Sequence, residues 1–373
     1  MIPLTDLEPQ HRALRQQLLD AVARVFDERA FVLGRHVREF ERSVASLLGA
    51  EAAIGVSSGT DALIVSLLAA GVGPGDEVIT TPLSFVATAE AIVRVGATPR
   101  FVDVDEATLC LDPEAARAAI TPRTRALLPV HLFGHPADVV ALAELASTAG
   151  LELIEDCAQA FGARASGESG GRYVGVWGSY GAFSFFPAKV LGGAGDGGLV
   201  LTTAERAERV ERLRQHGTRD KETFVEVGGN FRLDALQAAV LSVKLPHVMD
   251  WVEGRRRVAA RYLAAFSERA TPGVELPVWH DGHAFNHFVI RSDARDALKR
   301  ALSEAEIASA AYYATPLHRQ PCFASFEHGE LPRTERASRR LLALPIYPEL
   351  PGEAVERIVE VVDAAARKAT NER

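Results

Sequence analysis

Short apolar runs alternate with helical patterns through the first half of the chain, and this alternation limits the fold more than any other feature. Strands that alternate with helices usually lie parallel in one sheet, with the helices as crossovers. We therefore expect an α/β fold with a large, mostly parallel sheet. The expected strands are 53–56, 77–80, 99–102, 126–130 and 151–154, and the expected helices are 61–70, 85–95, one begun by Asp112-Pro113, and 137–149.

The character of the sequence changes near Pro246. Residues 233–266 follow a helical pattern that is interrupted at this proline, and a smaller α+β unit follows. A chain of 373 residues is long enough for two such units. We therefore divide it into a large domain, 1–245, and a small C-terminal domain, 246–373. The elements expected in the second are a strand at 287–290 and helices at 294–304 and from 353 onward.

Composition excludes several classes of protein. The 49 acidic and 41 basic side chains leave a net charge of −8, and no stretch concentrates lysine and arginine as a nucleic-acid site requires. The longest apolar stretch, 62–72, is shorter than the roughly 20 residues of a membrane helix. The N-terminus has no secretory-signal pattern, so we expect a cytoplasmic protein. The three cysteines show no paired spacing and are expected to be free thiols.

Lys189 lies between an aromatic run, 183–186, and a glycine-dense loop, 192–198. Most lysines are solvated at the protein surface. Here, aromatic packing on one side and a loop without side chains on the other would partly desolvate the amine. Desolvation lowers the pKa of a lysine toward the nucleophilic form. A lysine that forms a Schiff base needs such a pKa.

Ligands of parallel sheets bind beyond the carboxyl ends of the strands. Asp156 and Gln159 follow the expected strand 151–154, should lie at this edge and are candidates for binding a cofactor. A carboxylate there can stabilise the protonated pyridine nitrogen of pyridoxal phosphate, which makes the cofactor an electron sink. Aspartate also commonly caps a following helix. Taken alone, Asp156 fits both interpretations. The other segments that follow strands are 57–60, 81–85 and 131–134.

The segment 57–61, Ser-Ser-Gly-Thr-Asp, ends an expected strand and opens a helix. Free backbone N–H groups and the helix dipole bind phosphate at such a position, and Gly59 lets the backbone approach. Serine, threonine and aspartate are also common helix caps, which is the better interpretation of this segment alone. Its coincidence with Lys189 and Asp156 favours a phosphate site.

Two further patterns do not indicate a site. Gly193, Gly195 and Gly198 spell G-x-G-x-x-G, yet a strand-like run follows them rather than a helix, so we exclude a dinucleotide site. His131 and His135 have the spacing of zinc ligands on a helix, but Gly134 and Pro136 break any helix there. We therefore expect no metal.

Several segments together resemble the DegT/DnrJ/EryC1/StrS family of sugar aminotransferases, over nearly the whole chain. The resemblance implies the aspartate-aminotransferase architecture (fold type I): a large cofactor domain, a small C-terminal domain, and a homodimer with active sites at its interface. The matching segments are 59–63, 129–134, 155–159, 183–198, 229–234 with 237–239, 316–321 and 344–348.

The resemblance also implies roles for single residues. Lys189 matches the Schiff-base lysine of the family, and a sister group that removes a hydroxyl carries histidine there. Phe85 falls where the family places an aromatic ring over the pyridine, and Thr60 and Ser184 fall on phosphate-binding positions. Asn230 falls on the asparagine that reaches the cofactor phosphate of the neighbouring subunit.

One segment departs from the family pattern. Family members often read His-Tyr-Pro before Pro-Leu-His, whereas this chain reads Tyr312-Tyr313-Ala314-Thr315 before the Pro-Leu-His of His318. Because the family lines its acceptor pocket with this segment, Tyr312, Tyr313 and His318 are candidates for contacts with sugar hydroxyls. Buried tyrosines with satisfied hydroxyls are an equal alternative. Arg232 and Arg319 are candidates for binding an anionic substrate.

These observations predict a pyridoxal-phosphate aminotransferase that moves an amino group from glutamate to a keto group of a nucleotide-linked sugar. Lys189 would hold the cofactor and shuttle the proton, and Asp156 would keep the ring nitrogen protonated. A similarity of 215–217 and the Asn230 segment to 3-keto enzymes favours C3 over C4. The alternatives are amination of a cyclitol ketone of the scyllo-inosose type and a cofactor-binding protein without turnover.

Overall fold

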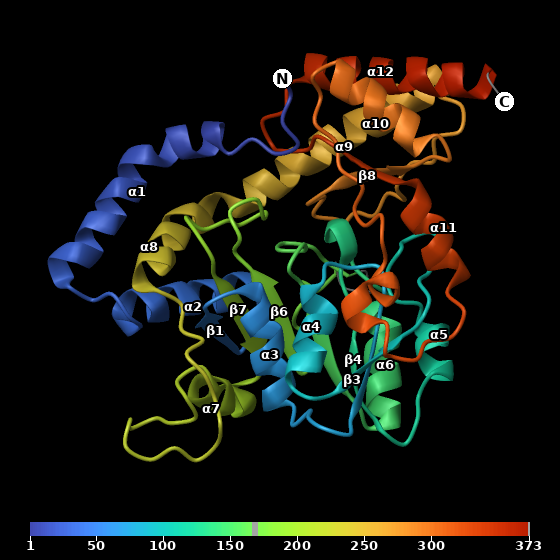
Figure 1. Cartoon of the computed structure of the whole chain (residues 1–373). Coiled ribbons are helices and arrows are strands. Elements are labelled where there is room, and N and C mark those ends of the chain that lie inside the picture. The colour runs from blue at the N-terminus through green and yellow to red at the C-terminus, as the bar shows by residue number, and fades with distance from the viewer. Residues whose placement is uncertain (166–170, 372–373) are drawn as a thin grey trace.

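A seven-stranded sheet lies at the centre of the molecule, with helices on both of its faces (Figure 1). The computed structural model describes residues 1–165 and 171–371. In these residues the strand order is β1-β7-β6-β5-β4-β2-β3. The bounds are β1 (Ala52–Val56), β2 (Glu77–Thr80), β3 (Thr98–Phe101), β4 (Thr124–Leu128), β5 (Glu152–Asp156), β6 (Tyr180–Ser184) and β7 (Gly198–Thr202).

The sheet is mostly parallel, which confirms the expected fold class. Only β7 runs antiparallel to its neighbours, β6 and β1. No helix separates β6 from β7, so the chain reverses through the glycine-dense loop instead of crossing over. Because β1 lies beyond β7, it points the same way as β5 and β6. The carboxyl ends of β1, β2, β4, β5 and β6 therefore share one edge.

Eight helices of the described part of the chain accompany this sheet. The expected helices are confirmed within a few residues, and Asp112 caps α5 by accepting hydrogen bonds from two backbone N–H groups. The structure adds α1, α2 and α7, which the sequence patterns did not indicate. The bounds are α1 (Glu8–Glu28), α2 (Gly34–Leu48), α3 (Gly59–Ala69), α4 (Ala87–Arg94), α5 (Pro113–Ala118), α6 (Val139–Ala149), α7 (Ala204–Leu213) and α8 (Ala235–Lys244).

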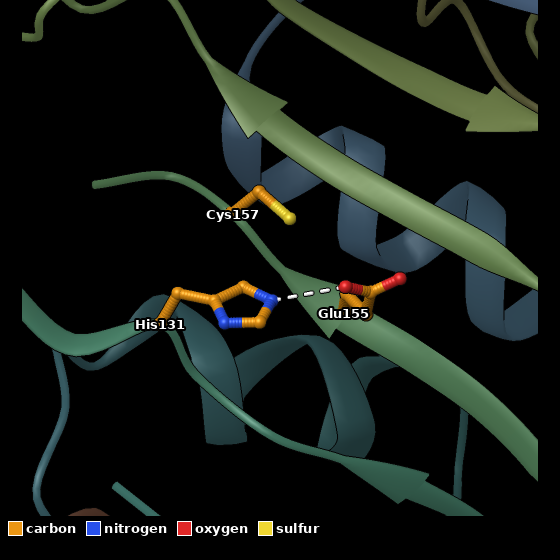
Figure 2. A group of neighbouring side chains, drawn as sticks. All are labelled: His131, Glu155 and Cys157. Atoms are coloured by element: carbon orange, nitrogen blue, oxygen red, sulfur yellow. Dashed lines mark hydrogen bonds and ion pairs between the residues drawn. The ribbon is translucent and has the colours of Figure 1, made fainter. Parts of the chain in front are cut away.

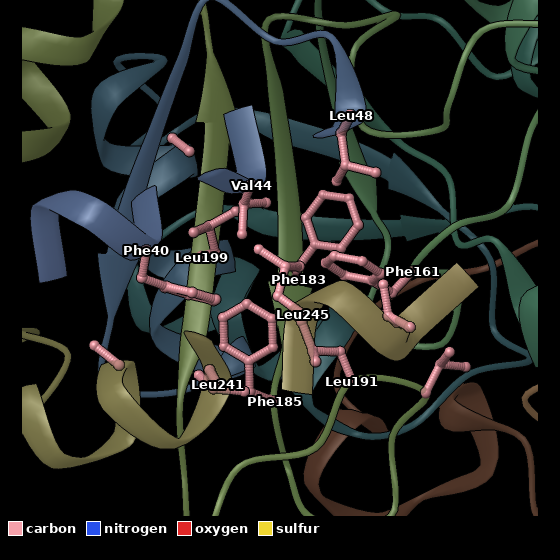
Figure 3. Packing of buried hydrophobic residues seen from close by; sticks show 14 of the residues in the cluster. Phe40, Val44, Leu48, Phe161, Phe183, Phe185, Leu191, Leu199, Leu241 and Leu245 are labelled. Carbon is pink, nitrogen blue, oxygen red and sulfur yellow. The ribbon is translucent and has the colours of Figure 1, made fainter. Parts of the chain in front are cut away.

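Alternating side chains of β6 and β7 divide the core between the two faces of the sheet. Phe183, with Phe185 just beyond β6, packs on α2 and α8, and the rings of Phe40 and Phe185 meet edge-on at 5.4 Å (Figure 3). Tyr180 and Ala182 face the opposite side, where α3 and α7 lie. Aromatic packing on both sides thus fixes the strand that leads to Lys189.

A smaller unit with its own core follows α8. A 3₁₀ turn at Leu245–His247 separates α8 from α9, so the helical pattern is interrupted at Pro246 as expected. Ile2 pairs with Ile307, so the first residues of the chain lie against this unit (Figure 1). The division at 245/246 therefore stays a prediction. The bounds are α9 (Val248–Arg269), β8 (Phe288–Arg291), α10 (Arg295–Glu304), α11 (Pro332–Arg340), β9 (Leu341–Leu344) and α12 (Gly352–Asn371).

Two expectations from composition can be compared with the structure. None of the helices in the described ranges is long and apolar enough to cross a membrane. Cys110 and Cys157 are buried, Cys322 is exposed, and all three are free thiols.

Candidate active site

A cavity of about 390 Å³ opens at the carboxyl edge of the sheet. Segments that follow β1, β2, β5 and β6 line it, together with residues of the smaller unit. Most of the residues selected from the sequence meet in this cavity, and they come from five separate segments of the chain. These are Gly59, Thr60, Phe85, Asp156, Gln159, Ser184, Lys189, Tyr312 and Tyr313.

Lys189 reaches the cavity from the turn that follows β6. Its backbone N–H donates to the carbonyl of Phe186 at 2.9 Å, which closes the turn. Burial lowers the pKa of the Lys189 amine to about 8, and the negative charge of Asp156 opposes part of this shift. At pH 7 about a tenth of the amine is therefore unprotonated, far more than for an ordinary lysine, and this form is the nucleophile.

Asp156 is the last residue of β5 and is 4% exposed. Its carboxylate accepts hydrogen bonds from the Thr88 hydroxyl at 2.8 Å and from the Ala158 N–H at 3.1 Å. Burial raises the pKa of Asp156, whereas these hydrogen bonds and the charge of Lys189 act in the opposite direction. In the described residues the next element after β5 is β6, so the helix-cap interpretation is wrong. The carboxylate is instead held at the cavity wall.

The N-terminus of α3 forms another wall. Ser58 caps the helix by accepting a 3.0 Å hydrogen bond from the Asp61 N–H, so the cap interpretation is correct here. Gly59 and Thr60 also line the cavity, so the same segment is available to a ligand. A Cβ on Gly59 would lie 2.6 Å from the Cβ of Ser184. Only glycine lets the helix approach the end of β6 this closely.

Gln159 connects the sheet to the smaller unit. Its Oε1 accepts from the Phe133 N–H at 2.7 Å, and its Nε2 donates to the Tyr313 hydroxyl at 2.9 Å. Burial raises the pKa of Tyr313, so the phenol stays neutral and keeps its own proton. The Tyr313 hydroxyl can therefore donate a hydrogen bond to a bound molecule while it accepts one from Gln159.

Four residues selected from the sequence lie outside the cavity. Asn230 is exposed, and its backbone forms an isolated β-bridge with that of Gln215. The backbone of Arg232 forms a similar bridge with that of Val56. His318 lies in a separate hollow, where its Nε2 is 2.9 Å from Oε1 of Glu335. Arg319 contacts the same carboxylate at 2.7 Å. Within one chain, none of these side chains reaches the cavity, and their roles in binding stay predictions.

The cavity also contains residues that sequence patterns did not indicate. Thr88 lies in the first turn of α4, and Asn286 and His287 precede β8. Burial, followed by the charges of Lys189 and Arg255, lowers the pKa of His287 to about 3, so its ring is neutral. The rule that ligands bind beyond the carboxyl ends of strands applies to the central sheet, so it cannot identify residues that come from the smaller unit. No local sequence pattern predicts that Thr88 lines the cavity either.

One buried cluster has the composition of a metal site but not its chemistry. The ligand atoms of His131, Glu155 and Cys157 lie within 4.8 Å of one another (Figure 2). The Nδ1 of His131 accepts from the Ala137 N–H at 3.0 Å, so the ring proton is on Nε2, which lies 3.0 Å from Glu155. Glu155 also accepts from three backbone N–H groups, those of Gly175, Trp177 and Gly178. The coordinating atoms of His131 and Glu155 are thus already used in hydrogen bonds within the protein.

The residues of the cavity fit pyridoxal phosphate. Lys189 offers an amine of lowered pKa for the aldehyde, and Asp156 offers a buried carboxylate for the ring nitrogen. The N-terminus of α3 and Ser184 offer N–H and O–H donors for the phosphate. The side chain of Phe85, which is 58% exposed, lies at the rim where a ring could stack.

Comparison with known proteins agrees with this site. A protein from Geobacillus stearothermophilus named pleiotropic regulatory protein is 43% identical over 366 residues, 97% of each chain. A UDP-N-acetyl-3-dehydro-alpha-D-glucosamine 3-aminotransferase from Acidithiobacillus ferrooxidans is 43% identical over 362 residues, again 97% of each chain. The solved structure of DesV from S. venezuelae has a TM-score of 0.93 at 42% identity and 98% coverage of both chains.

The sequence model of the DegT/DnrJ/EryC1/StrS aminotransferase family matches residues 12–363, which is nearly the whole chain. The chain therefore belongs to this family, whose transaminases use pyridoxal phosphate.

Proposed function

We propose that the chain transfers an amino group from glutamate to the C3 keto group of a nucleotide-linked sugar, in amino-sugar biosynthesis. The observation that carries this proposal is the meeting of Lys189, Asp156 and Tyr313 in one cavity. The first two residues suit transamination, and Tyr313 adds a phenol that can bind a sugar hydroxyl or keto oxygen. The name of the Acidithiobacillus ferrooxidans relative supports C3 as the site of amination.

Each residue has a defined task in this reaction. Pyridoxal phosphate, when bound, supplies an electron sink for the substrate carbon that loses a proton. Lys189 would hold the aldehyde and, once freed by the incoming amine, would remove the proton from the substrate carbon as a general base. As a general acid, the same lysine would then deliver this proton to C4′ of the cofactor, and in the half-reaction with the sugar it would carry a proton from C4′ to the acceptor carbon. Asp156 would keep the proton on the ring nitrogen throughout.

The charge of the substrates requires groups from outside the cavity of one chain. A nucleotide diphosphate and the carboxylates of glutamate are anionic, whereas the only cationic side chain among the described lining residues is Lys189. We infer that a homodimer completes the site, with Asn230 and Arg232 of each chain serving the cavity of the other. The exposure of Asn230 and its position outside its own cavity support this arrangement.

A panel of acceptors tests the proposed function. Purified protein with bound cofactor is incubated with glutamate and with UDP- or dTDP-linked 3-keto or 4-keto sugars, and NMR locates the new amine. We expect turnover with a 3-keto sugar and an amine at C3. Turnover only with the 4-keto sugars would refute C3, and turnover with a free cyclitol ketone but no nucleotide sugar would refute the substrate class.

A further inference from the structure

A second buried lysine lies near the loop that follows Lys189. Lys244, the last residue of α8, is 1% exposed, and its ammonium donates a hydrogen bond to the carbonyl of Gly192. The ring of His11 is 3.5 Å away, and the described residues provide no carboxylate partner. Burial lowers the pKa of Lys244 to about 8. Burying an amine is costly, so its contact with this loop calls for an explanation.

Gln237 contacts the same loop from the same helix. Its Oε1 accepts a 2.8 Å hydrogen bond from the Ala194 N–H. Gln237 and Lys244 are seven residues apart, which is close to two turns of an α-helix, so both lie on one face of α8. Two side chains of this face thus bind the backbone of residues 192–194.

The loop has few means of holding itself in place. Its glycines carry no side chains, and a Cβ on Gly193 or Gly195 would lie 2.7 or 2.8 Å from Gln237. Backbone hydrogen bonds fix it only at the end of β6, where the Gly193 N–H donates to Phe185 at 2.7 Å. Two glycines of the G-x-G-x-x-G pattern, Gly193 and Gly195, therefore leave room for the Gln237 side chain of α8, whereas a Cβ on Gly198 would meet the Ser58 carbonyl oxygen.

We propose that Lys244 and Gln237 are positioning residues, which hold the 192–195 segment and thereby set where the Lys189 amine lies in the cavity. Neither side chain lines the cavity, so both act through the backbone. This inference rests on the proposed role of Lys189. Placement of the amine matters because a displacement of about 1 Å at a reacting group can lower a rate about a hundredfold.

The test uses two variants that each remove a contact with the loop and a third variant that retains the hydrogen-bond acceptor at position 237. Lys244→Met keeps the apolar stem without the donor, Gln237→Met removes the acceptor, and Gln237→Glu retains an acceptor of the same shape. With cofactor bound, we expect kcat to fall about ten- to a hundredfold in the two methionine variants, with KM for glutamate within about twofold. Gln237→Glu should retain most of the wild-type kcat.

Two readouts are independent of turnover. The pH at which the visible absorbance of the bound cofactor changes should shift in both methionine variants, because the lysine that carries the cofactor has moved. In the cofactor-free chain, hydrogen exchange of the Ala194 amide should be faster in Gln237→Met than in wild type or Gln237→Glu. Unchanged exchange in Gln237→Met would overturn the proposal.

Leu241→Ala is the matched control for general destabilisation. Leu241 lies on α8, is fully buried and belongs to the core cluster shown in Figure 3. Its removal should lower Tm through a cavity, while kcat and the absorbance profile stay as in wild type. The same loss of kcat in Leu241→Ala, or wild-type profiles in the methionine variants, would show a structural role only. A wild-type protein without a lysine-bound cofactor would instead refute the proposed function.

Discussion

The Nε2 of Gln159 donates a 2.9 Å hydrogen bond to the hydroxyl of Tyr313, and this contact joins the end of β5 to the segment that departs from the family pattern. Gln159 was selected as a cofactor residue and Tyr313 as a substrate residue. In the structure, both polar groups of Gln159 bind the protein, one to Phe133 and one to Tyr313. Gln159 therefore orients the phenol, which remains available to a ligand.

Tyr313→Phe should weaken acceptor use and stability together. The Gln159 Nε2 would lose its partner in a buried place, which costs about 1–3 kcal/mol of unfolding free energy. The keto sugar would lose a hydrogen-bond donor, so its kcat/KM should fall about tenfold or more, with a smaller effect on the glutamate half-reaction. Urea unfolding and separate half-reactions measure the two effects.

Tyr312→Phe is the control for this variant. Tyr312 also lines the cavity, but its hydroxyl makes no hydrogen bond within the described part of the chain, and its ring packs on His287 at 4.8 Å. Removing the Tyr312 hydroxyl should lower the unfolding free energy less than removing the Tyr313 hydroxyl does. Equal stability losses in the two variants would contradict the importance of the Gln159–Tyr313 contact.

Asp156→Asn should separate chemistry from folding. Asparagine can keep the contact with the Ala158 N–H, and Thr88 can turn its hydroxyl proton toward Ser84, whose oxygen is 2.7 Å away. The variant lacks the charge that keeps the ring nitrogen protonated, so turnover should fall by about three orders of magnitude, or roughly 4 kcal/mol. Thermal unfolding with bound cofactor should change by only a few degrees. Unchanged turnover would remove Asp156 from the mechanism.

Lys189→Met should stabilise the cofactor-free chain at neutral pH. The pKa of Lys189 is about 8 in the folded chain and has an ordinary value of 10.5. Below pH 8 the amine is protonated in both states, and the folded state carries the full cost of a buried ammonium. Replacing it should therefore raise the unfolding free energy by on the order of 3 kcal/mol at pH 7.

The lowered pKa of Lys189 also determines how the unfolding free energy of wild type changes with pH. Between about pH 8 and 10.5 the unfolded wild-type chain binds more protons than the folded one, so the stability of wild type rises with pH. The advantage of Lys189→Met should shrink across this interval. Urea unfolding of both cofactor-free proteins at pH 7 and at pH 10 measures it, and a constant difference would contradict the lowered pKa.

The strands β1 to β5 of the central sheet could be predicted because they alternate with helical patterns, whereas no helix separates β6 from β7. The rule that ligands bind at the carboxyl ends of strands located Asp156 and the 57–60 segment, at the ends of β5 and β1. Lys189 was indicated instead by the aromatic run and the glycine-dense loop on either side of it. The alternation could not locate α1 and α2, because these helices precede it. β9 was missed because a short apolar run such as 341–344 fits a strand and a buried helix equally well.

The parts of the site that could not be predicted come from tertiary structure. Asn286 and His287 reach the cavity from the smaller unit, and nothing in their local sequence states which side of the sheet that unit covers. Thr88 binds Asp156 across 68 residues of sequence. The separation of His318 from the cavity depends on its contact with Glu335, 17 residues further along the chain.

Arg214→Met should destabilise the fold without a direct effect on the site. Arg214, just after α7, is 6% exposed, and its Nη1 binds Oε1 of Glu41 and the carbonyl of Gly55. Removing the arginine leaves the buried carboxylate of Glu41 without a counter-charge, which costs about 3–5 kcal/mol. Urea unfolding measures the loss. The double variant with Glu41→Gln should regain part of the stability, and no regain would contradict a buried ion pair.

Mixed dimers of Lys189→Ala and Asn230→Ala chains test whether two chains share each active site. Alone, the first variant lacks the amine in both of its sites, and the second lacks the asparagine that we place at the phosphate of the other chain. In a mixed dimer, the intact Lys189 of one chain and the intact Asn230 of the other would meet in one site, while both defects fall in the second. Random mixing should then give roughly a quarter of the wild-type activity, because half of the dimers are mixed and each has one intact site. If Asn230 served its own chain, every site would carry one defect, and mixed dimers verified by mass spectrometry would gain no activity.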